Sequence, residues 1–469
     1  MKKIISLLLA AMLVCSLAAC GGSGAGASGG DKEYTGLQAG WGQVNVTPDF
    51  MVGLGGYGNV EERITNEYID YLYVTCIALS EGDQKVLLYT VDNTNFDLAI
   101  TEETRPLVHN ATGVPLDNMF FGATHSHSTP QHSHGADWGK NYRTLLKNAC
   151  VEAAEVALAD LAPATMFTGS KQLEKMTFVR HYIHEDGQYS GSNYNEHLDP
   201  NTIVGHTTEA DNEMRLVKFD REEKQDILMV NWQAHVDHAA ENGMKNMSAD
   251  FPGALRDTVM EETDMLVAYF TGASGNLSPR SYIPGEAEKL SMRKYGEKLG
   301  KEAISILDSM TPITGAGIAT QRKMVTVQID HTWDHMIAQA REIRSIWDKQ
   351  SRDKATEAGR AYNFSSAYHA NAIISRVSMP ASEQMELKVC RIGTLGIING
   401  TYEMFSENGE FIKDNSPYEA TFIIEGNSTY QASEAAHDYR CYEADTGRTV
   451  KGTAEQLAKE FVDMLTAIK

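Results

Sequence analysis

The sequence predicts an α/β fold in which mixed, buried β-sheets are flanked by helices within a single large domain. Short, continuous, β-branched runs, which are typical of buried strands, alternate along the chain with segments of helical periodicity. Strands and helices interleaved in this way indicate sheets that are covered by helices. No internal repeat or proline-rich linker divides the 469-residue chain, so one large domain is the simplest organisation.

The expected strands are short apolar runs, and the expected helices are longer segments of mixed polarity. Strands are predicted at residues 71–79, 86–91, 119–123, 227–234, 266–271, 389–398 and 421–425. Helices are predicted at residues 142–161, 252–262, 287–310, 335–361 and 453–468. In the fourth helix, Ile337, Ile343 and Ile346 recur at helical spacing among charged residues, which predicts an amphipathic surface helix.

The composition is that of a soluble globular chain with a substantial core, because 42% of the residues are hydrophobic and 22% are charged. The formal net charge is −22. Such an acidic surface repels phosphate backbones, which argues against nucleic acid as a partner. Solubility alone is the simplest explanation of the acidity.

The N-terminus has the layout of an export signal. Two lysines precede a mostly apolar run at residues 4–14, which is too short and wrongly flanked for a membrane-spanning helix. The ending LAAC resembles a bacterial lipoprotein box, in which the signal is cut before Cys20 and that thiol carries lipid. Ordinary secretion with cleavage nearby is the alternative.

We therefore expect a signal peptide at residues 1–20, a flexible Gly/Ser tether at residues 21–36 and the folded domain at residues 37–469. Lipid on Cys20 would hold the protein outside the cytoplasm, at the surface of the bacterial cell membrane.

Four cysteines, Cys76, Cys150, Cys390 and Cys441, lie beyond the signal, and none has the CxxC spacing of a zinc ribbon. Cys76 and Cys390 fall inside apolar strands. We therefore expect these two to be buried thiols.

Several histidines follow the strand predicted at residues 119–123. His125 and His127 are separated by one residue, and extended backbone turns alternate side chains to the same face. His132 and His134 lie in the same loop, and α/β proteins place ligands at the carboxyl ends of strands. A histidine-dense loop of this kind predicts metal binding, with a solvated polar loop as the alternative.

Two more polar segments follow apolar strands. His235 and His238 follow the strand at residues 227–234, and a second strand-terminal histidine pair favours shared metal coordination. The segment TGASGNLSP at residues 271–279 offers glycines that let backbone approach a substrate and N–H groups that could hold an oxyanion. Its Ser278 is a candidate nucleophile or hydrogen-bond donor, and an ordinary turn that contains a serine is the alternative.

Together these segments resemble the neutral ceramidase family. HSHSTP at residues 125–130 matches the layout of the family's His-Thr-His-Ser-Gly-Pro segment, and GNLSP at residues 275–279 matches its Gly-Asp-Val-Ser-Pro. The apolar strand that ends at His235 matches another family motif, and GWGQVNVTP at residues 40–48 is similar to its first strand. The motifs occur in the family's order over about residues 38–445.

The resemblance implies a catalytic Zn²⁺ ion held by two histidines, a glutamate and a tyrosine. These ligands correspond here to His125, His235, Glu403 and Tyr430. Glu403 ends the segment GTYE, which stands where the family has Pro-Gly-Glu, and Tyr430 ends the late segment NSTY. Taken without the resemblance, the two would be a surface glutamate and a strand-end tyrosine.

The resemblance also implies roles for residues beside the metal. His127 corresponds to a substrate-contacting histidine and is the first candidate for the general acid. Arg180 corresponds to an arginine that reaches toward the substrate, with a surface ion pair as the alternative, and Ser278 corresponds to a serine once favoured as nucleophile. Asn276 and Tyr57 are expected to bind substrate, and Tyr57 lies in a glycine-rich loop that the family places near the substrate mouth.

The implied function is a zinc-dependent hydrolase that uses metal-activated water to cleave the amide bond of an N-acyl sphingoid or related N-acyl substrate. The sequence departs from the family's pattern, since Asn276 replaces an aspartate and Thr129 replaces a glycine. A zinc hydrolase of the same fold that acts on a different amide or ester is therefore an alternative. A lipoprotein that only captures solutes or metal is another. The family's C-terminal immunoglobulin-like domain is not expected here.

Overall fold

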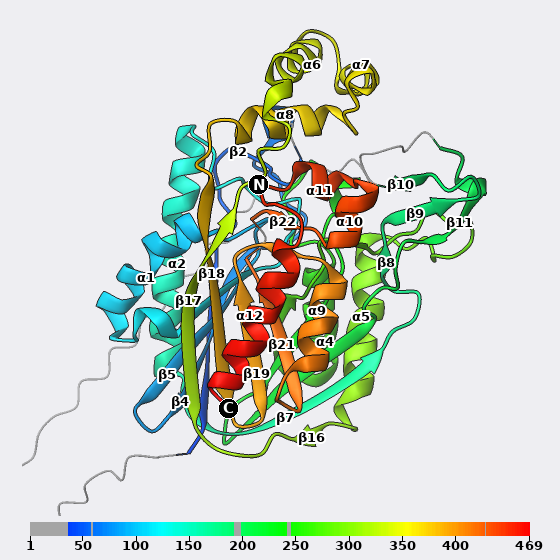
Figure 1. Cartoon of the computed structure of the whole chain (residues 1–469). Coiled ribbons are helices and arrows are strands. Elements are labelled where there is room, and N and C mark those ends of the chain that lie inside the picture. Colours follow the sequence, from blue (N-terminus) through cyan, green and yellow to red (C-terminus); the bar gives the residue numbers. More distant parts are fainter. Residues whose placement is uncertain (1–35, 58–59, 192–197, 242–244, 427) are drawn as a thin grey trace, which may run out of the picture. The chain divides into compact units, whose positions relative to one another are not determined.

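Two β-sheets lie face to face at the centre of the structure, and helices cover both outer faces (Figure 1). The computed structural model describes residues 36–57, 60–191, 198–241, 245–426 and 428–469, all within one compact unit that spans residues 35–469. The arrangement confirms the predicted α/β fold with mixed, helix-flanked sheets. The expected signal peptide, the tether up to residue 35 and the lipid-carrying Cys20 lie outside the described residues.

The larger sheet has the strand order β14-β13-β12-β7-β1-β4-β5-β6, and β16 also pairs with β7. It is antiparallel except at its two ends, where β13 pairs with β14 and β5 pairs with β6 in parallel. Its strands are β1 (Gln38–Asn45), β4 (Tyr73–Glu81), β5 (Gln84–Val91), β6 (Met119–Ala123), β7 (Ala162–Gln172), β12 (Glu213–Arg221), β13 (Ile227–Trp232), β14 (Leu266–Thr271) and β16 (Thr311–Pro312).

The larger sheet curves until its two ends meet, because strand β14 contacts both β5 and β6. The Thr90 hydroxyl of β5 donates a hydrogen bond of 2.6 Å to the carbonyl oxygen of Tyr269 in β14. The curvature brings together the carboxyl ends of β6, β13 and β14, which carry the three polar segments singled out in the sequence.

The smaller sheet packs its inner face on the larger one. Its order is β17 (Ile318–Gln328), β18 (Ser382–Ile392), β19 (Leu395–Gly400) and β21 (Ala420–Glu425), with β19 and β21 parallel. Buried side chains from both sheets, such as Ile77, Phe120 and Phe422, fill the space between them.

Helices close the two outer faces. On the larger sheet, α2 (Asp137–Ala159) packs against β1 and β4, while α4 (Phe251–Thr263) and α5 (Met292–Leu307) cover β12 to β14. On the smaller sheet, α9 (Ser406–Asn415) and α12 (Thr453–Ala467) cover the outer face, as Figure 1 shows. Successive side chains along each strand therefore point into two different cores, one between the sheets and one under the helices.

The other described elements are short strands, single turns and smaller helices. The strands are β2 (Val52–Gly53), β3 (Ile64–Thr65), β8 (Phe178–Val179), β9 (His181–His184), β10 (Tyr189–Gly191), β11 (Ile203–His206), β15 (Leu277–Ser278), β20 (Glu403–Met404) and β22 (Tyr430–Gln431). The helices are α1 (Leu98–Thr112), α3 (His238–Glu241), α6 (Ile337–Lys349), α7 (Arg352–Gly359), α8 (Ala367–Arg376), α10 (Glu434–Tyr439) and α11 (Tyr442–Thr446). The 3-10 turns are η1 (Val60–Glu62), η2 (Leu116–Asn118), η3 (Pro200–Thr202), η4 (Asp334–Met336) and η5 (Arg360–Tyr362).

Two predicted elements are wrong in their extent. The strand expected at residues 389–398 is part of a hairpin, because the chain turns at Gly393, which has a φ of 56°. The helix expected at residues 335–361 is interrupted after α6. There Ser351 starts α7 as its N-cap, with its side chain accepting a hydrogen bond from the Lys354 amide.

The predicted burial of two thiols is confirmed. Cys76 in β4 and Cys390 in β18 are fully buried, and all four described cysteines are free of disulfides. Among the described residues, none of the helices combines the length and the apolar character that a membrane crossing needs.

Candidate metal centre

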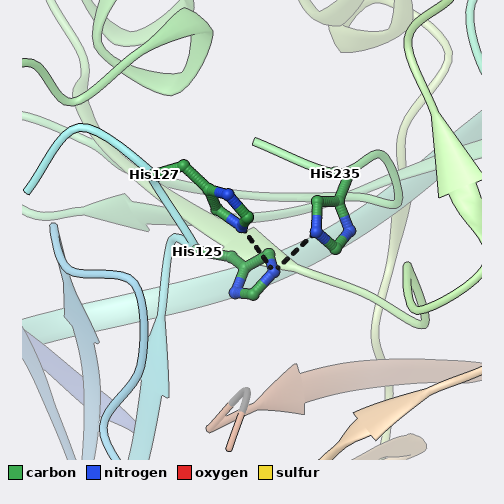
Figure 2. A group of neighbouring side chains, drawn as sticks. All are labelled: His125, His127 and His235. Atoms are coloured by element: carbon green, nitrogen blue, oxygen red, sulfur yellow. Dashed lines mark hydrogen bonds between the residues drawn. The ribbon is translucent and has the colours of Figure 1, made fainter. Parts of the chain in front are cut away.

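Three histidine rings meet where strands β6 and β13 end. Figure 2 shows the rings turned toward one another, with His125 Nε2 lying 3.1 Å from His235 Nε2 and 3.3 Å from His127 Nε2. None of the three residues is more than 7% exposed. The structure thus brings together His125 and His235, the two predicted histidine ligands, and the predicted substrate-contacting His127.

Hydrogen bonds between the segments hold this arrangement. The hydroxyl of Thr271, the last residue of β14, donates to the Thr124 carbonyl oxygen over 2.9 Å, and the His127 amide donates to the Val236 carbonyl oxygen over 2.9 Å. His125 itself adopts a φ of 67°, a left-handed conformation that costs a non-glycine residue roughly 1–2 kcal/mol. The surrounding contacts offset that cost and fix the direction of the ring.

The His125 ring presents a lone pair to the other two rings. Its Nδ1 lies 2.7 Å from the carbonyl oxygen of Thr94. A carbonyl can only accept, so the neutral ring carries its proton on Nδ1 and none on Nε2. This is the backbone contact that orients metal-binding histidines.

A buried carboxylate oxygen completes the group. Oε2 of Glu403 lies 3.4 Å from His125 Nε2, and it has no hydrogen-bond partner among the described residues. An unprotonated nitrogen beside an unpartnered carboxylate oxygen is unfavourable in a buried site unless a cation lies between them. Imidazole nitrogens with a carboxylate oxygen are a donor set that zinc accepts, so the residues present fit this ion.

Burial keeps the rings of His127 and His235 in the neutral form that a metal requires. It lowers the pKa of His127 and of His235 well below the usual histidine range, with a smaller contribution from the positive charge of Arg180. Burial also raises the pKa of Glu403, against the opposing positive charge of Arg180. Neutral imidazole is the metal-binding form of histidine.

Glu403 and Tyr430 lie side by side because β20 and β22 pair in parallel with these two residues opposite each other. The Glu403 amide donates to the Thr429 carbonyl oxygen over 2.8 Å, and the Tyr430 hydroxyl hydrogen-bonds to the Glu403 carboxyl. The pairing brings Tyr430 to the edge of the histidine group. Its role as a metal ligand stays a prediction.

Arg180 is held by acceptors from three segments. It donates to the Gly275 carbonyl oxygen at 2.8 Å and to the Tyr430 hydroxyl at 3.2 Å, and it pairs with Glu443 at 2.7 Å. Burial alone would raise the pKa of Glu443, but the charges of His181 and Arg180 hold it at about 2. The surface ion pair considered for Arg180 is therefore a buried one.

Glu443 is a residue that the sequence analysis missed. It is fully buried and contacts His181 Nε2 at 2.8 Å, across 262 residues of the chain. Nothing in the local sequence of helix α11 marks it, because its importance comes only from these distant partners.

Tyr57 and Gly56 enclose His127. The Tyr57 ring meets the His127 ring edge-on at 5.0 Å between centroids. A Cβ on Gly56 would lie 2.4 Å from the His127 ring, and its φ is 91°, so the position requires glycine. Tyr57 is thus placed beside the predicted substrate-contacting histidine, as a substrate-binding residue would need to be.

Asp237 is a second residue that the sequence analysis left without a role. Its negative charge acts on His127, and its carboxylate pairs with Arg280 at 3.0 Å. Asp237 could have been predicted as a site residue, because it lies two residues after His235 in the same strand-terminal segment. The neighbouring His238 contacts the Leu290 carbonyl oxygen at 2.9 Å instead of joining the group.

Ser278 and Asn276 form hydrogen bonds with residues outside the histidine group. Ser278 Oγ accepts the Arg280 amide at 3.2 Å, and a nucleophilic serine would need a base within hydrogen-bond reach. Asn276 accepts the Ser406 amide at 2.8 Å and donates to Glu407 at 2.9 Å, which fixes the start of α9. The predicted catalytic role of Ser278 and substrate contact of Asn276 stay predictions.

Solved structures share this fold. A crystal structure of neutral ceramidase from Pseudomonas aeruginosa has a TM-score of 0.68 at 15% sequence identity, over 93% of this chain and 75% of that chain. A ceramidase complexed with C2 has the same TM-score and identity, over 92% of this chain and 75% of that chain. No family model and no curated protein matches the sequence. In its fold, this chain is similar to the neutral ceramidases.

Proposed function

We propose that this protein is a zinc-dependent hydrolase of the ceramidase type, which cleaves the amide bond of an N-acyl substrate. One observation carries the proposal. His125 Nε2 lies within 3.4 Å of two other imidazole nitrogens and a buried carboxylate oxygen, while its Nδ1 contacts the Thr94 carbonyl oxygen. A cation bound among these atoms would supply the positive charge that the buried carboxylate lacks. The similarity of the fold to ceramidases supports amide hydrolysis.

We assign His125, His235 and Glu403 to the metal, with Tyr430 as the fourth ligand beside Glu403. The Thr94 carbonyl supports the assignment of His125, because it fixes the ring in the tautomer that binds metal through Nε2. This ligand set leaves His127 for the substrate.

A zinc ion held there would polarise the scissile carbonyl and supply a water of lowered pKa. His127, which burial keeps neutral, can accept a proton at Nε2 and pass it to the leaving nitrogen. Arg180, fixed by Glu443 and Gly275, keeps a positive charge beside Tyr430 and can stabilise negative charge on the substrate oxygen.

Metal analysis of the purified protein together with a hydrolysis assay tests the proposal. We expect about one zinc ion per chain and release of the acyl group from short-chain N-acyl sphingoid amides. A chelator should abolish turnover, and added zinc should restore it. A protein that binds no metal, or that hydrolyses amides equally well without it, contradicts the proposal. A protein that binds zinc but hydrolyses neither amides nor esters would instead be a binding lipoprotein.

We further propose that lipid on Cys20 anchors the enzyme to the outer face of the bacterial cell membrane. The signal layout and the Gly/Ser-rich segment that follows it support this proposal. Cells fed with labelled palmitate should incorporate the label into the wild-type protein and not into Cys20→Ser. Equal labelling of both proteins would contradict the anchor.

A further inference from the structure

Arg63 differs from the other buried arginines of the described chain in having no carboxylate partner. Each of the others is at most 7% exposed and pairs with a carboxylate within 3.9 Å; they are Arg105, Arg180, Arg221, Arg256 and Arg376. Arg63 is 5% exposed, and none of the described carboxylates forms an ion pair with it. A buried charge without a counter-charge is unfavourable, so the other contacts of Arg63 must offset a substantial cost.

The guanidinium of Arg63 contacts three groups beside the candidate metal centre. Nη2 donates to the His127 carbonyl oxygen at 2.7 Å, and Nη1 donates to the Gly55 carbonyl oxygen at 2.8 Å. Its Cζ carbon lies 5.2 Å from the centre of the Tyr57 ring, which is a cation–π contact. These contacts join the residue that precedes β3 to the loop that follows β6.

The same contacts determine how His127 is held. Its amide donates to the Val236 carbonyl oxygen at 2.9 Å and its carbonyl accepts from Arg63, so both backbone polar groups are fixed. Its ring meets Tyr57 edge-on and lies against the backbone of Gly56, the residue after the second carbonyl that Arg63 binds. Arg63 is therefore placed to fix the direction in which the ring presents Nε2.

The chemistry of a guanidinium suits this position. It carries several donors in a rigid plane and no acceptor, so it can bind two carbonyl oxygens at once in a fixed geometry. A carboxylate beside Arg63 would compete with both carbonyl oxygens for those donors. The missing counter-charge thus fits a residue that orients its neighbours better than one that stabilises the fold through an ion pair.

We propose that Arg63 is a positioning residue of the reaction, which holds His127 in the orientation needed to pass a proton to the leaving nitrogen. The inference rests on the proposed amide hydrolysis and adds to it a residue that acts through another. Removal of Arg63 should therefore slow only the cleavage reactions that need this proton.

Two substrates that share one acyl group test the proposal. N-hexanoylsphingosine releases an amine that must receive a proton, whereas 4-nitrophenyl hexanoate releases a phenolate that needs none. We expect Arg63→Met to lower kcat/KM about 10- to 100-fold for the amide and less than about threefold for the ester. The loss should fall on kcat, with KM and zinc content near those of the wild type. Arg63→Lys keeps the charge but not the two-sided donor geometry, so it should restore only part of the amide activity.

Arg221→Met is the matched control. Arg221 is also 5% exposed, but it pairs with Asp160 and contacts the Ala39 carbonyl oxygen near the start of β1. That substitution should lower stability and keep the ratio of amide to ester activity. A ratio that is unchanged in Arg63→Met, or that falls equally in Arg221→Met, overturns the proposal. If Arg63→Met does not fold, Arg63→Lys decides, and an unchanged ratio there counts against the proposal.

Two further outcomes have their own readouts. If the wild type cleaves only the amide, Arg63→Met should add no loss in a His127→Gln background, and an added loss of the same size overturns the proposal. If the wild type does not cleave the amide, the proposed function fails, and NMR of histidine-labelled protein tests Arg63 separately. The His127 ring signal, assigned with His127→Gln, should shift in Arg63→Met and not in Arg221→Met. A signal that Arg63→Met leaves unchanged would end the positioning role as well.

Discussion

Two buried groups of histidine and carboxylate side chains lie on either side of Arg180 and Tyr430, and they differ in how their charges are matched. In the first group, His125 Nε2 faces the ring nitrogens of His127 and His235, and the nearby oxygen of Glu403 has no hydrogen-bond partner among the described residues. No lysine or arginine of the described residues forms an ion pair with this carboxylate.

In the second group, the carboxylate is paired with an arginine. One oxygen of Glu443 pairs with Arg180 at 2.7 Å and the other contacts His181 at 2.8 Å, while the Tyr439 hydroxyl lies 2.8 Å from the remaining nitrogen of His181. In both groups the possible ligand atoms lie within 4.8 Å of one another. Proximity alone therefore does not distinguish the two groups, which differ in the arginine that pairs with Glu443 and has no counterpart at Glu403 among the described ion pairs.

Removing a histidine from the first group should have the largest effect on zinc content and on activity. We expect His235→Ala to lose its zinc and about 1000-fold or more of its activity, because the metal supplies several kcal/mol of transition-state stabilisation. Zinc content by mass spectrometry and kcat/KM measure this. The exposed His335→Ala is the control and should behave as wild type. A His235→Ala protein with full zinc and turnover would remove the distinction between the two groups.

Breaking the second group should instead weaken the fold. Glu443→Gln leaves Arg180 buried without its counter-charge, and we expect urea unfolding to give a free energy lower by about 3–5 kcal/mol. The control is Glu297→Gln, since Glu297 belongs to a surface pair with Arg293 and should change stability by about 0.5 kcal/mol or less. Equal effects of the two substitutions would show that the buried network contributes no more than an exposed ion pair.

Chelation should destabilise the protein through the first group only. A metal present at about 100 times its dissociation constant adds about 2.7 kcal/mol of stability, so a chelator should lower the wild-type unfolding free energy by that amount. His235→Ala should not respond, because it holds no metal to lose. A response of His235→Ala as large as that of the wild type would place the bound metal elsewhere.

The second group should also give the protein part of its acid sensitivity. The pKa of Glu443 is lowered from 4.5 to about 2 in the fold. Its stabilising contribution is therefore complete above pH 4.5 and is lost as the pH falls toward 2, with about 2 kcal/mol gone by pH 3. Unfolding free energies at pH 6 and pH 3 should differ less in Glu443→Gln than in the wild type, by that amount. Identical pH dependence would contradict the assignment.

The smallest effect is expected at Cys441, whose sulfur is close enough to His181 and Glu443 to suggest a second metal. Cys441 caps helix α11 by accepting the Ala444 amide, a role that serine performs as well. Cys441→Ser should cost less than about 1 kcal/mol and leave the zinc content unchanged. A fall in zinc content would make the second group a metal site too.

The same contrast explains what the sequence could predict. His125 and His235 could be predicted from the sequence because each lies shortly after an apolar strand, which is a local pattern. Glu403 and Tyr430 came only from the family resemblance, since neither has a local signal. Glu443 was missed because its partners lie far away in the chain.

The fold was predictable in class but not in all its boundaries. The run from Val389 to Ile398 is rich in apolar residues, and the turn that divides β18 from β19 is marked within it by Gly393 and Thr394. The contact between β14 and β6 could not be predicted from the sequence, because the curvature of a sheet depends on long-range pairing.

The register between β20 and β22 has a consequence for how this protein can diverge. Glu403 and Tyr430 stand opposite each other in the pairing, so the chain between them can lengthen or shorten without separating the two side chains. A slip of a single residue would instead turn Tyr430 to the other side of the strand. Distant relatives can therefore be sought by this pair of residues, even where the spacing between them has drifted.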